Sequence, residues 1–124
     1  MIISFSWTTP ALLAGAKTCT RRHWTPSHAR KIRDGQLVDA WDRLPRVKGA
    51  RKVATIRITA APELQSTMQI PGSDWFAEGF DWLSHFGTLD DAKVAHAIWT
   101  GWRSKAQLLY VVRFELEALV DARR

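Results

Sequence analysis

The feature that most constrains the fold is the alternation of side chains along residues 53–60. The segment reads Val-Ala-Thr-Ile-Arg-Ile-Thr-Ala. In an extended chain successive side chains point to opposite faces, so this order separates two kinds of surface. Small and aliphatic residues share one face: Ala54, Ile56, Ile58 and Ala60. The other face carries Val53, Thr55, Arg57 and Thr59. The pattern predicts a strand, which Pro62 ends or bends.

Weaker patterns predict the other elements. Further strands are expected at residues 2–6, 17–22, 37–41, 63–68 and 107–116. Helices are expected between Pro10 and Gly15, over 27–33, over 75–83 and, capped by Thr88 and Asp91, over 89–102. We therefore predict an α+β fold, a small and mostly antiparallel β-barrel of five or six strands with helices over its ends and sides.

Length and composition fit one domain. A chain of 124 residues, 46% hydrophobic, supports a single modest core, so we predict one domain over residues 1–124. Cys19 is the only cysteine, which excludes an intrachain disulfide and a cysteine-based zinc site. His23 and His28 are five residues apart, a spacing that brings them together on neither a helix nor a strand. No metal or cofactor is therefore expected.

The chain shows no sign of a membrane address. Its first residues lack the basic region and long apolar core of a signal peptide, and no run has the length of a membrane helix. These features predict a cytoplasmic protein without a membrane partner. The tail at residues 118–124 is expected to be frayed.

The chain is strongly basic, with a net charge of +6 and an isoelectric point near 10.1. This balance favours an anionic partner such as RNA, DNA or a nucleoside-type ligand, although solubility alone also explains it. The charge is concentrated in the predicted helix 27–33 and in the loop 43–52, which holds five cations and no acid. The candidate nucleic-acid-binding residues are Arg30, Arg33, Arg46, Lys48, Arg51 and Lys52. For the helix, a solvated basic face is the simpler interpretation.

Residues 15–22, Gly-Ala-Lys-Thr-Cys-Thr-Arg-Arg, gather reactive side chains after a short apolar run. Gly15 permits a turn, and an extended segment after it places Thr20 and Arg22 on one face. A threonine hydroxyl is a weak nucleophile until a base removes its proton, and a lysine is a base only when its pKa is lowered. Lys17 has two cationic neighbours that favour its neutral form, Arg21 and Arg22.

Glu78 is the carboxylate that we assign to the same site, where it would orient the lysine or carry a proton to the leaving group. Trp24 follows the motif closely and is the tryptophan expected to stack on a base. The structural alternative is that Lys17 is a surface cation and Thr20 only a strand former. Glu78 would then be half of a salt bridge with Arg22. A buried or half-buried pair of Lys17 and Glu78 would itself hold the two segments together, and such pairs are often structural.

The motif Gly-x-Lys-x-x-Thr-x-Arg after a short apolar helix resembles that of the ASCH domain family, small β-barrels related to PUA-type RNA-binding domains. The likeness spans about residues 2–117 and includes the later stretches 35–38, 53–59, 77–80 and 112–114. It implies a PUA-like barrel. Within the family, a bacterial amidohydrolase of acetylated cytidine uses the lysine and threonine of the motif with a downstream glutamate. The resemblance thus implies catalytic roles for Lys17, Thr20 and Glu78.

Three functions are compatible with these residues. The first is hydrolysis of an N-acylated cytidine or related amide by a threonine nucleophile, a lysine base and a glutamate. The second is a non-catalytic RNA- or DNA-binding module, and the third is a metal-independent ribonuclease. The substrate-binding residues would be Gly15, Arg21, Arg22 and Trp24. The hydrolase hypothesis also predicts geometry: the side chains of Lys17, Thr20, Arg22 and Glu78 should face one cleft.

Overall fold

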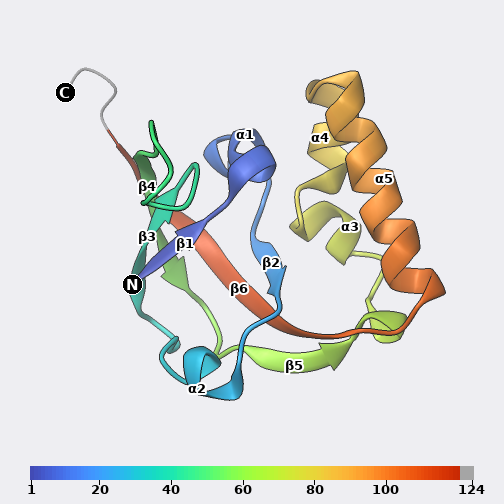
Figure 1. Cartoon of the computed structure of the whole chain (residues 1–124), viewed down its shortest axis with the longest axis horizontal. Coiled ribbons are helices and arrows are strands. Elements are labelled where there is room, and N and C mark those ends of the chain that lie inside the picture. Colours follow the sequence, from blue (N-terminus) through green and yellow to red (C-terminus); the bar gives the residue numbers. More distant parts are fainter. Residues whose placement is uncertain (121–124) are drawn as a thin grey trace.

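A curled, mixed β-sheet forms the body of the computed structural model, which describes residues 1–120 (Figure 1). Its six strands follow the order β1-β3-β4-β6-β2 within these residues, and β5 also pairs with β6. Strand β1 is parallel to β3, and the other pairings are antiparallel. The strands span Ile2–Ser4 (β1), Cys19–Arg22 (β2), Leu37–Trp41 (β3), Lys52–Ile58 (β4), Glu63–Ser66 (β5) and Leu108–Leu119 (β6).

Strand β4 shows the two faces that its alternation predicts. Ala54, Ile56 and Ile58 are fully buried, whereas Thr55 and Arg57 on the opposite face are only partly covered. Strand β6 holds the sheet together because its first part pairs with both β2 and β5 and its second part pairs with β4. The sheet therefore curls into a half-barrel, and the predicted α+β class with flanking helices is confirmed.

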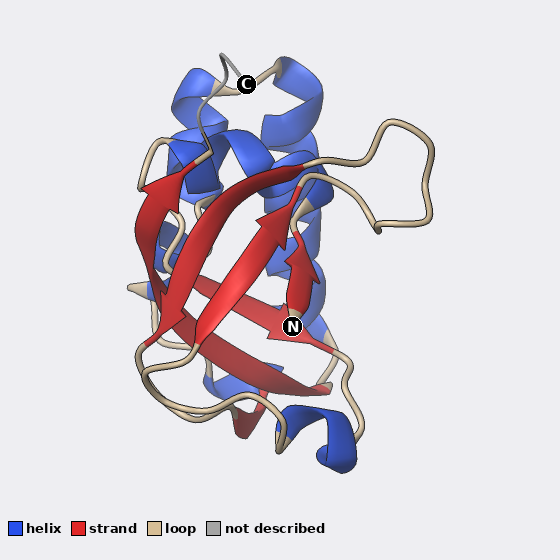
Figure 2. Cartoon of the chain, turned by 90° about the vertical axis from the view of Figure 1, so that its left-hand side faces the viewer, coloured by secondary structure: helices blue, strands red, loops and turns tan. Residues whose placement is uncertain are grey.

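The helices lie over one side and the ends of this half-barrel. Helices α3, α4 and α5 form a layer beside the strands, and α2 lies at the far end of the sheet (Figure 1). In Figure 2, the curled strands are seen in front of the helical layer. The helices span Ser6–Thr8 (η1), Thr9–Leu13 (α1), Pro26–Ala29 (α2), Thr67–Gln69 (η2), Asp74–Ala77 (α3), Phe80–Phe86 (α4) and Leu89–Ser104 (α5).

Apolar side chains pack in two clusters within the described residues. The first joins strands β1, β3, β4 and β6 with α1 and the segment after α2. The second lies under the helical layer, where Phe80, Leu83 and Ala95 are buried beside tryptophans from η1, α3, α4 and α5. Trp7 stacks on Phe80 with ring centroids 5.9 Å apart. Most of the tryptophan side chains therefore serve the second cluster.

The predicted helix over residues 75–83 is wrong in one respect, because it is two helices. Gly79, with φ of +84°, separates α3 from α4. A Cβ at this position would lie 2.8 Å from the Cβ of Ala11 and 3.1 Å from the Cβ of Lys17. Only glycine combines the left-handed backbone with so close an approach. The break thus brings the end of α3 against the motif.

Other boundaries also differ from prediction. The helix expected over 27–33 is limited to Pro26–Ala29, with Thr25 as its N-cap residue. Part of the tail expected to fray belongs to β6, where Ala118 and Leu119 pair with β4. Residues 121–124 of that tail lie outside the described residues. Within residues 1–120, no helix has the length and apolar character needed to cross a membrane.

Candidate functional site

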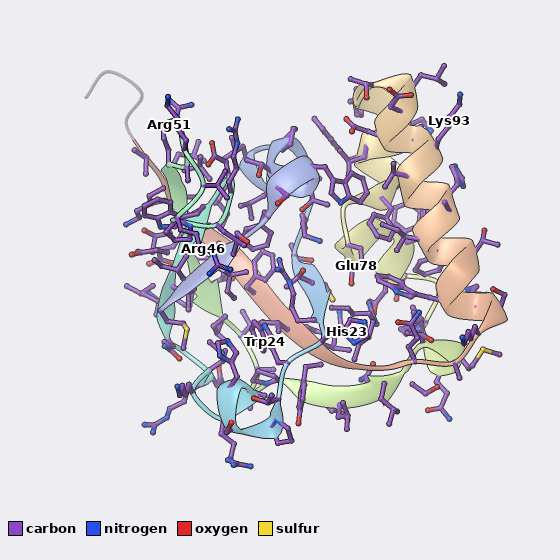
Figure 3. The ribbon with its side chains drawn as sticks, viewed as in Figure 1. His23, Trp24, Arg46, Arg51, Glu78 and Lys93 are labelled. Carbon is purple, nitrogen blue, oxygen red and sulfur yellow. The ribbon has the colours of Figure 1, made fainter. Side chains whose placement is uncertain are left out.

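The motif strand and the end of α3 are held together by backbone contacts. Gly15, with φ of +74°, turns the chain out of α1 and into the motif. The amide of Lys17 donates to the carbonyl of Ala11 at 3.2 Å, and that of Thr18 donates to the carbonyl of Ala77 at 2.7 Å. Lys17 and Glu78, 61 residues apart in sequence, are thus brought together. Figure 3 shows Glu78 on the side of β2 that faces the helices.

Lys17 and Glu78 form a buried ion pair. The Nζ of Lys17 lies 3.1 Å from Oε1 of Glu78 and donates to the Glu78 backbone carbonyl at 2.9 Å. Each residue is 2% exposed. Burial lowers the pKa of Lys17, because the charged amine loses water, and the negative charge of Glu78 only partly opposes this. The alternative of a surface lysine is therefore wrong.

Arg21 links Glu78 to a second carboxylate. Its Nη1 donates to Oε2 of Glu78 at 2.8 Å, and its Nη2 donates to Oδ2 of Asp74. Arg113 from β6 donates two hydrogen bonds to the carboxylate of Asp74, at 3.0 and 2.9 Å. Burial alone would raise the pKa of Asp74, but hydrogen bonds from Arg113 and Arg21 outweigh it and hold that pKa below its usual value. The result is a fixed charged network behind the motif strand.

The sequence pattern did not assign Asp74 and Arg113 to the site. Asp74 is the first residue of α3, after the N-cap residue Ser73, and its carboxylate binds Arg21 and Arg113 instead of capping the helix. The available signal was Arg113, a charged residue placed directly between the apolar residues Val112 and Phe114. A buried carboxylate satisfies such a cation, but sequence alone does not name which one.

Cys19 lies inside this network, and its thiol is unreactive at neutral pH. Its Sγ lies 3.6 Å from Oε2 of Glu78, and the residue is fully buried. Burial and the negative charge of Glu78 raise the pKa of the Cys19 thiol to about 12. The thiol therefore stays protonated at neutral pH and is not a nucleophile there.

Thr20 and Arg22 form the other half of the motif. The Nε of Arg22 donates to Oγ1 of Thr20 at 3.1 Å, and its Nη2 donates to the carbonyl of Ser4 at 2.6 Å. The guanidinium also lies over the ring of Phe5, 5.5 Å from its centroid. Burial lowers the pKa of Arg22. The alternative salt bridge between Glu78 and Arg22 is wrong, because Glu78 pairs with Lys17 and Arg21 instead.

A cavity of about 300 Å³ lies against both halves of the motif. Its polar lining comprises Lys17, Thr20, Arg21, Arg22 and Glu78, together with Ser4, Ser6 and Thr8. Its apolar lining comprises Phe5, Trp7, Phe80, Ile98 and Trp102. The four side chains predicted to face one cleft therefore do so. A cavity with an aromatic wall and a cationic floor suits a small planar ligand.

Two predicted substrate-binding residues lie elsewhere. Trp24 packs against the first apolar cluster and touches His28, with ring centroids 4.7 Å apart. Figure 3 shows it near α2. Gly15 shapes the turn before the motif but does not line the cavity. The tryptophans at the cavity wall are Trp7 and Trp102, which sequence reasoning did not single out.

The predicted nucleic-acid-binding residues form two groups away from this cavity. Arg30 and Arg33 line a different cavity, of about 360 Å³, with Tyr110. The β3–β4 connection carries Arg46, Lys48 and Arg51, and Lys52, the first residue of β4, pairs with Asp39 at 2.9 Å. Figure 3 places Arg46 and Arg51 near β3 and β4, across the sheet from Glu78. Within residues 1–120, no three histidine, cysteine, aspartate or glutamate side chains gather as metal ligands.

Comparison with known proteins gives a relationship of fold. No protein-family model matches the sequence, and no curated protein matches it. Among solved structures, the chain is similar to protein EF3133 from Enterococcus faecalis V583, assigned to the family model DUF984, with a TM-score of 0.58. The two are 18% identical over 96% of this chain and 75% of that chain. Likeness at this identity extends to the fold alone.

Proposed function

We propose that this protein hydrolyses the amide bond of an N-acylated nucleoside, with Thr20 as nucleophile, Lys17 as base and Glu78 as the group that orients Lys17. The observation that carries the proposal is the shared cavity, in which a buried lysine, a threonine hydroxyl and a carboxylate lie against an aromatic wall. The resemblance of the motif to that of the ASCH amidohydrolase supports the same three roles.

The environment of Lys17 suits a general base. A lysine accepts a proton only in its neutral form, and burial lowers the pKa of Lys17 toward the range in which that form exists. Two oxygens of Glu78, one from the side chain and one from the backbone, fix its Nζ. Once protonated by Thr20, the amine gains the favourable interaction with Glu78 in full, so proton uptake is aided.

The environment of Thr20 suits a nucleophile. Its Oγ1 accepts a hydrogen bond from the Nε of Arg22 at 3.1 Å. The threonine proton is then directed away from Arg22, and the guanidinium charge stabilises the oxygen as that proton leaves. Thr20 is 4% exposed, so water competes little with these contacts.

The proposed reaction runs in two steps. Oγ1 of Thr20 attacks the carbonyl carbon of the amide while its proton passes to Nζ of Lys17. The carbon–nitrogen bond then breaks, and Lys17 returns the proton to the leaving amine of the nucleobase. Water hydrolyses the resulting ester with Lys17 again as base, which regenerates Thr20 and releases the carboxylic acid.

The cavity supports a single nucleoside better than a nucleic-acid strand. Its volume of about 300 Å³ is at the small end of ligand pockets. The ring centroids of Trp7 and Trp102 lie 5.9 and 5.8 Å from that of Phe80, and this aromatic wall offers a planar base a surface for stacking. The acyl group would then lie at the Lys17 and Thr20 end.

The test is an assay of hydrolysis on a panel of N-acylated cytidines and adenosines, in which the free nucleoside that is released is measured. Thr20→Val and Lys17→Arg should each abolish turnover, because the first removes the hydroxyl at similar volume and the second keeps the charge but supplies no neutral amine. The double variant should be about as slow as either single variant, since the two residues act as one unit. Lys93→Arg, at an exposed position on α5, is the matched control. Wild-type protein that hydrolyses no member of the panel would refute the proposal.

A further inference from the structure

One cation at the cavity has no carboxylate partner. Lys17 and Arg21 both pair with Glu78, and Arg113 pairs with Asp74. Among the described residues, no carboxylate lies within salt-bridge distance of Arg22. A largely buried guanidinium without a counter-charge is unfavourable unless something else supplies one.

Arg22 also has hydrogen-bond donors to spare. A guanidinium has five N–H donors, and the edge made by Nε and Nη2 is used by Thr20 and the Ser4 carbonyl. The edge made by Nη1 and the second hydrogen of Nη2 has no acceptor among residues 1–120. This planar edge can bind a carboxylate or phosphate through two parallel hydrogen bonds.

The charges around the cavity do not cancel. Glu78 and Asp74 are the two carboxylates of the network, and Arg21, Arg22 and Arg113 are its guanidinium groups. An excess of positive charge therefore remains even when Lys17 is neutral, as the proposed reaction requires. An anionic group on the ligand would balance it.

The segment beside Arg22 adds hydroxyl donors. Ser4 and Ser6 both line the cavity. Ser6 has φ of +46°, which makes it the one non-glycine residue with a left-handed backbone in the described part of the chain. The turn around it is fixed because the amide and hydroxyl of Thr8 both donate to the carbonyl of Phe5, at 3.0 and 2.7 Å. Strained residues of this kind concentrate at ligand sites, where the surroundings hold them in place.

We infer that the cavity binds a ligand with an anionic oxygen group, a carboxylate or a phosphate, which Arg22 receives together with the hydroxyls of Ser4 and Ser6. The inference rests on the proposed function for the rest of the ligand, an acylated nucleoside against the aromatic wall. The preferred substrate is then charged. It is either a nucleoside monophosphate or a nucleoside whose acyl group ends in a carboxylate.

Calorimetric titration with two pairs of ligands tests this inference without any hydrolysis. Cytidine and cytidine 5′-monophosphate form the phosphate pair, and N4-ethylcytidine and N4-carboxymethylcytidine form the carboxylate pair. None of the four contains an amide. The proteins are the wild type, Arg22→Gln and Lys93→Gln, which also removes one positive charge but from an exposed position on α5 that does not line the cavity.

We expect the anionic member of one pair to bind wild-type protein at least about tenfold more tightly than its neutral partner, as hydrogen bonds to a charged group provide. The responding pair identifies the source of the charge. Arg22→Gln should reduce the difference to about twofold or less, and Lys93→Gln should preserve it.

The inference fails if neither anionic ligand binds wild-type protein more tightly than its neutral partner, a comparison that needs no variant to fold. It also fails if the preference survives in Arg22→Gln. The proposed hydrolase is judged separately: an Arg22-dependent preference for anions, combined with no amide hydrolysis, would retain the anion site and remove the enzyme.

Discussion

The buried position of Glu78 predicts a large stability loss for Glu78→Gln. The carboxylate accepts from Lys17 at 3.1 Å and from Arg21 at 2.8 Å, and all three side chains are at most 3% exposed. Glutamine keeps the shape of the side chain, so the substitution changes the charge without emptying a core volume. Arg21 retains Asp74 as a partner, and Lys17 is the group left with an uncompensated charge.

The expected loss is about 3–5 kcal/mol of unfolding free energy, the range found when one partner of a buried ion pair is removed. A domain of this kind is stable by about 5–15 kcal/mol in total, so the variant should remain folded but be clearly weakened. This range is an upper bound here, because Lys17 can lose its proton and so avoid part of the penalty.

Because Lys17 can lose its proton, the stability loss caused by Glu78→Gln should depend on pH, and the pKa of Lys17 sets the sign of this dependence. Burial lowers the pKa of Lys17 in the folded protein, and loss of Glu78 lowers it further. Between the folded pKa and the unfolded value of about 10.5, the unfolded chain binds more protons, so stability rises with pH. The stability deficit of Glu78→Gln should therefore shrink as pH rises from about 6.5 to about 9.5.

Urea unfolding, followed by tryptophan fluorescence at these two pH values, measures the deficit. Glu117→Gln is the matched control, because Glu117 pairs with Arg57 at 2.7 Å but both side chains are more than a third exposed. The control should leave the unfolding midpoint nearly unchanged. A midpoint for Glu78→Gln equal to that of the control, or a deficit that grows with pH, would refute this account of the network.

Three further predictions follow. Gly79→Ala should lower the melting temperature more than Gly15→Ala. Both glycines have a left-handed backbone, but only at Gly79 would the new Cβ meet another atom, the Cβ of Ala11 at 2.8 Å, and equal losses in melting temperature would contradict this close approach. Cys19 should not react with iodoacetamide at about pH 8 until the protein is unfolded in urea, because burial raises the pKa of its thiol to about 12. Mass spectrometry detects the adduct, and fast labelling of the folded protein would contradict the burial of this thiol. Binding of single-stranded RNA or DNA should weaken steeply as the salt concentration rises, because contacts between basic residues and phosphates release counterions, and a double Arg46→Gln and Arg51→Gln variant should bind less tightly. Fluorescence anisotropy at two salt concentrations measures the affinity, and tight binding that does not depend on salt would count against a role for the loop.

Local sequence patterns determined much of the architecture. The strand at Leu37–Trp41 lies where its alternation predicts, and the capping box of Thr88 and Asp91 begins α5 as expected. Such features depend on side chains two to four residues apart, so a short window of sequence contains the relevant interactions. The motif strand could be oriented in the same way, which is why Thr20 and Arg22 could be assigned to one face.

The partners within the site were decided by tertiary structure. Sequence reasoning offered both Arg22 and Lys17 as ionic partners of Glu78, and the fold pairs Glu78 with Lys17 and with Arg21, which had not been suggested. It gave Asp74 no role in the site, although this residue joins Arg21 to Arg113 across 39 to 53 positions of the chain.

The physical reason is that charges pair by distance in space, and that distance depends on how α3 docks on β2. The docking itself depends on one short contact, where the missing side chain of Gly79 lets the end of α3 approach Lys17. The sequence shows a glycine between two helix-forming runs, but it does not show what lies opposite. The sequence therefore identified the reactive residue types. Their pairing, their burial and the lack of a carboxylate partner for Arg22 within residues 1–120 were determined only by the tertiary structure.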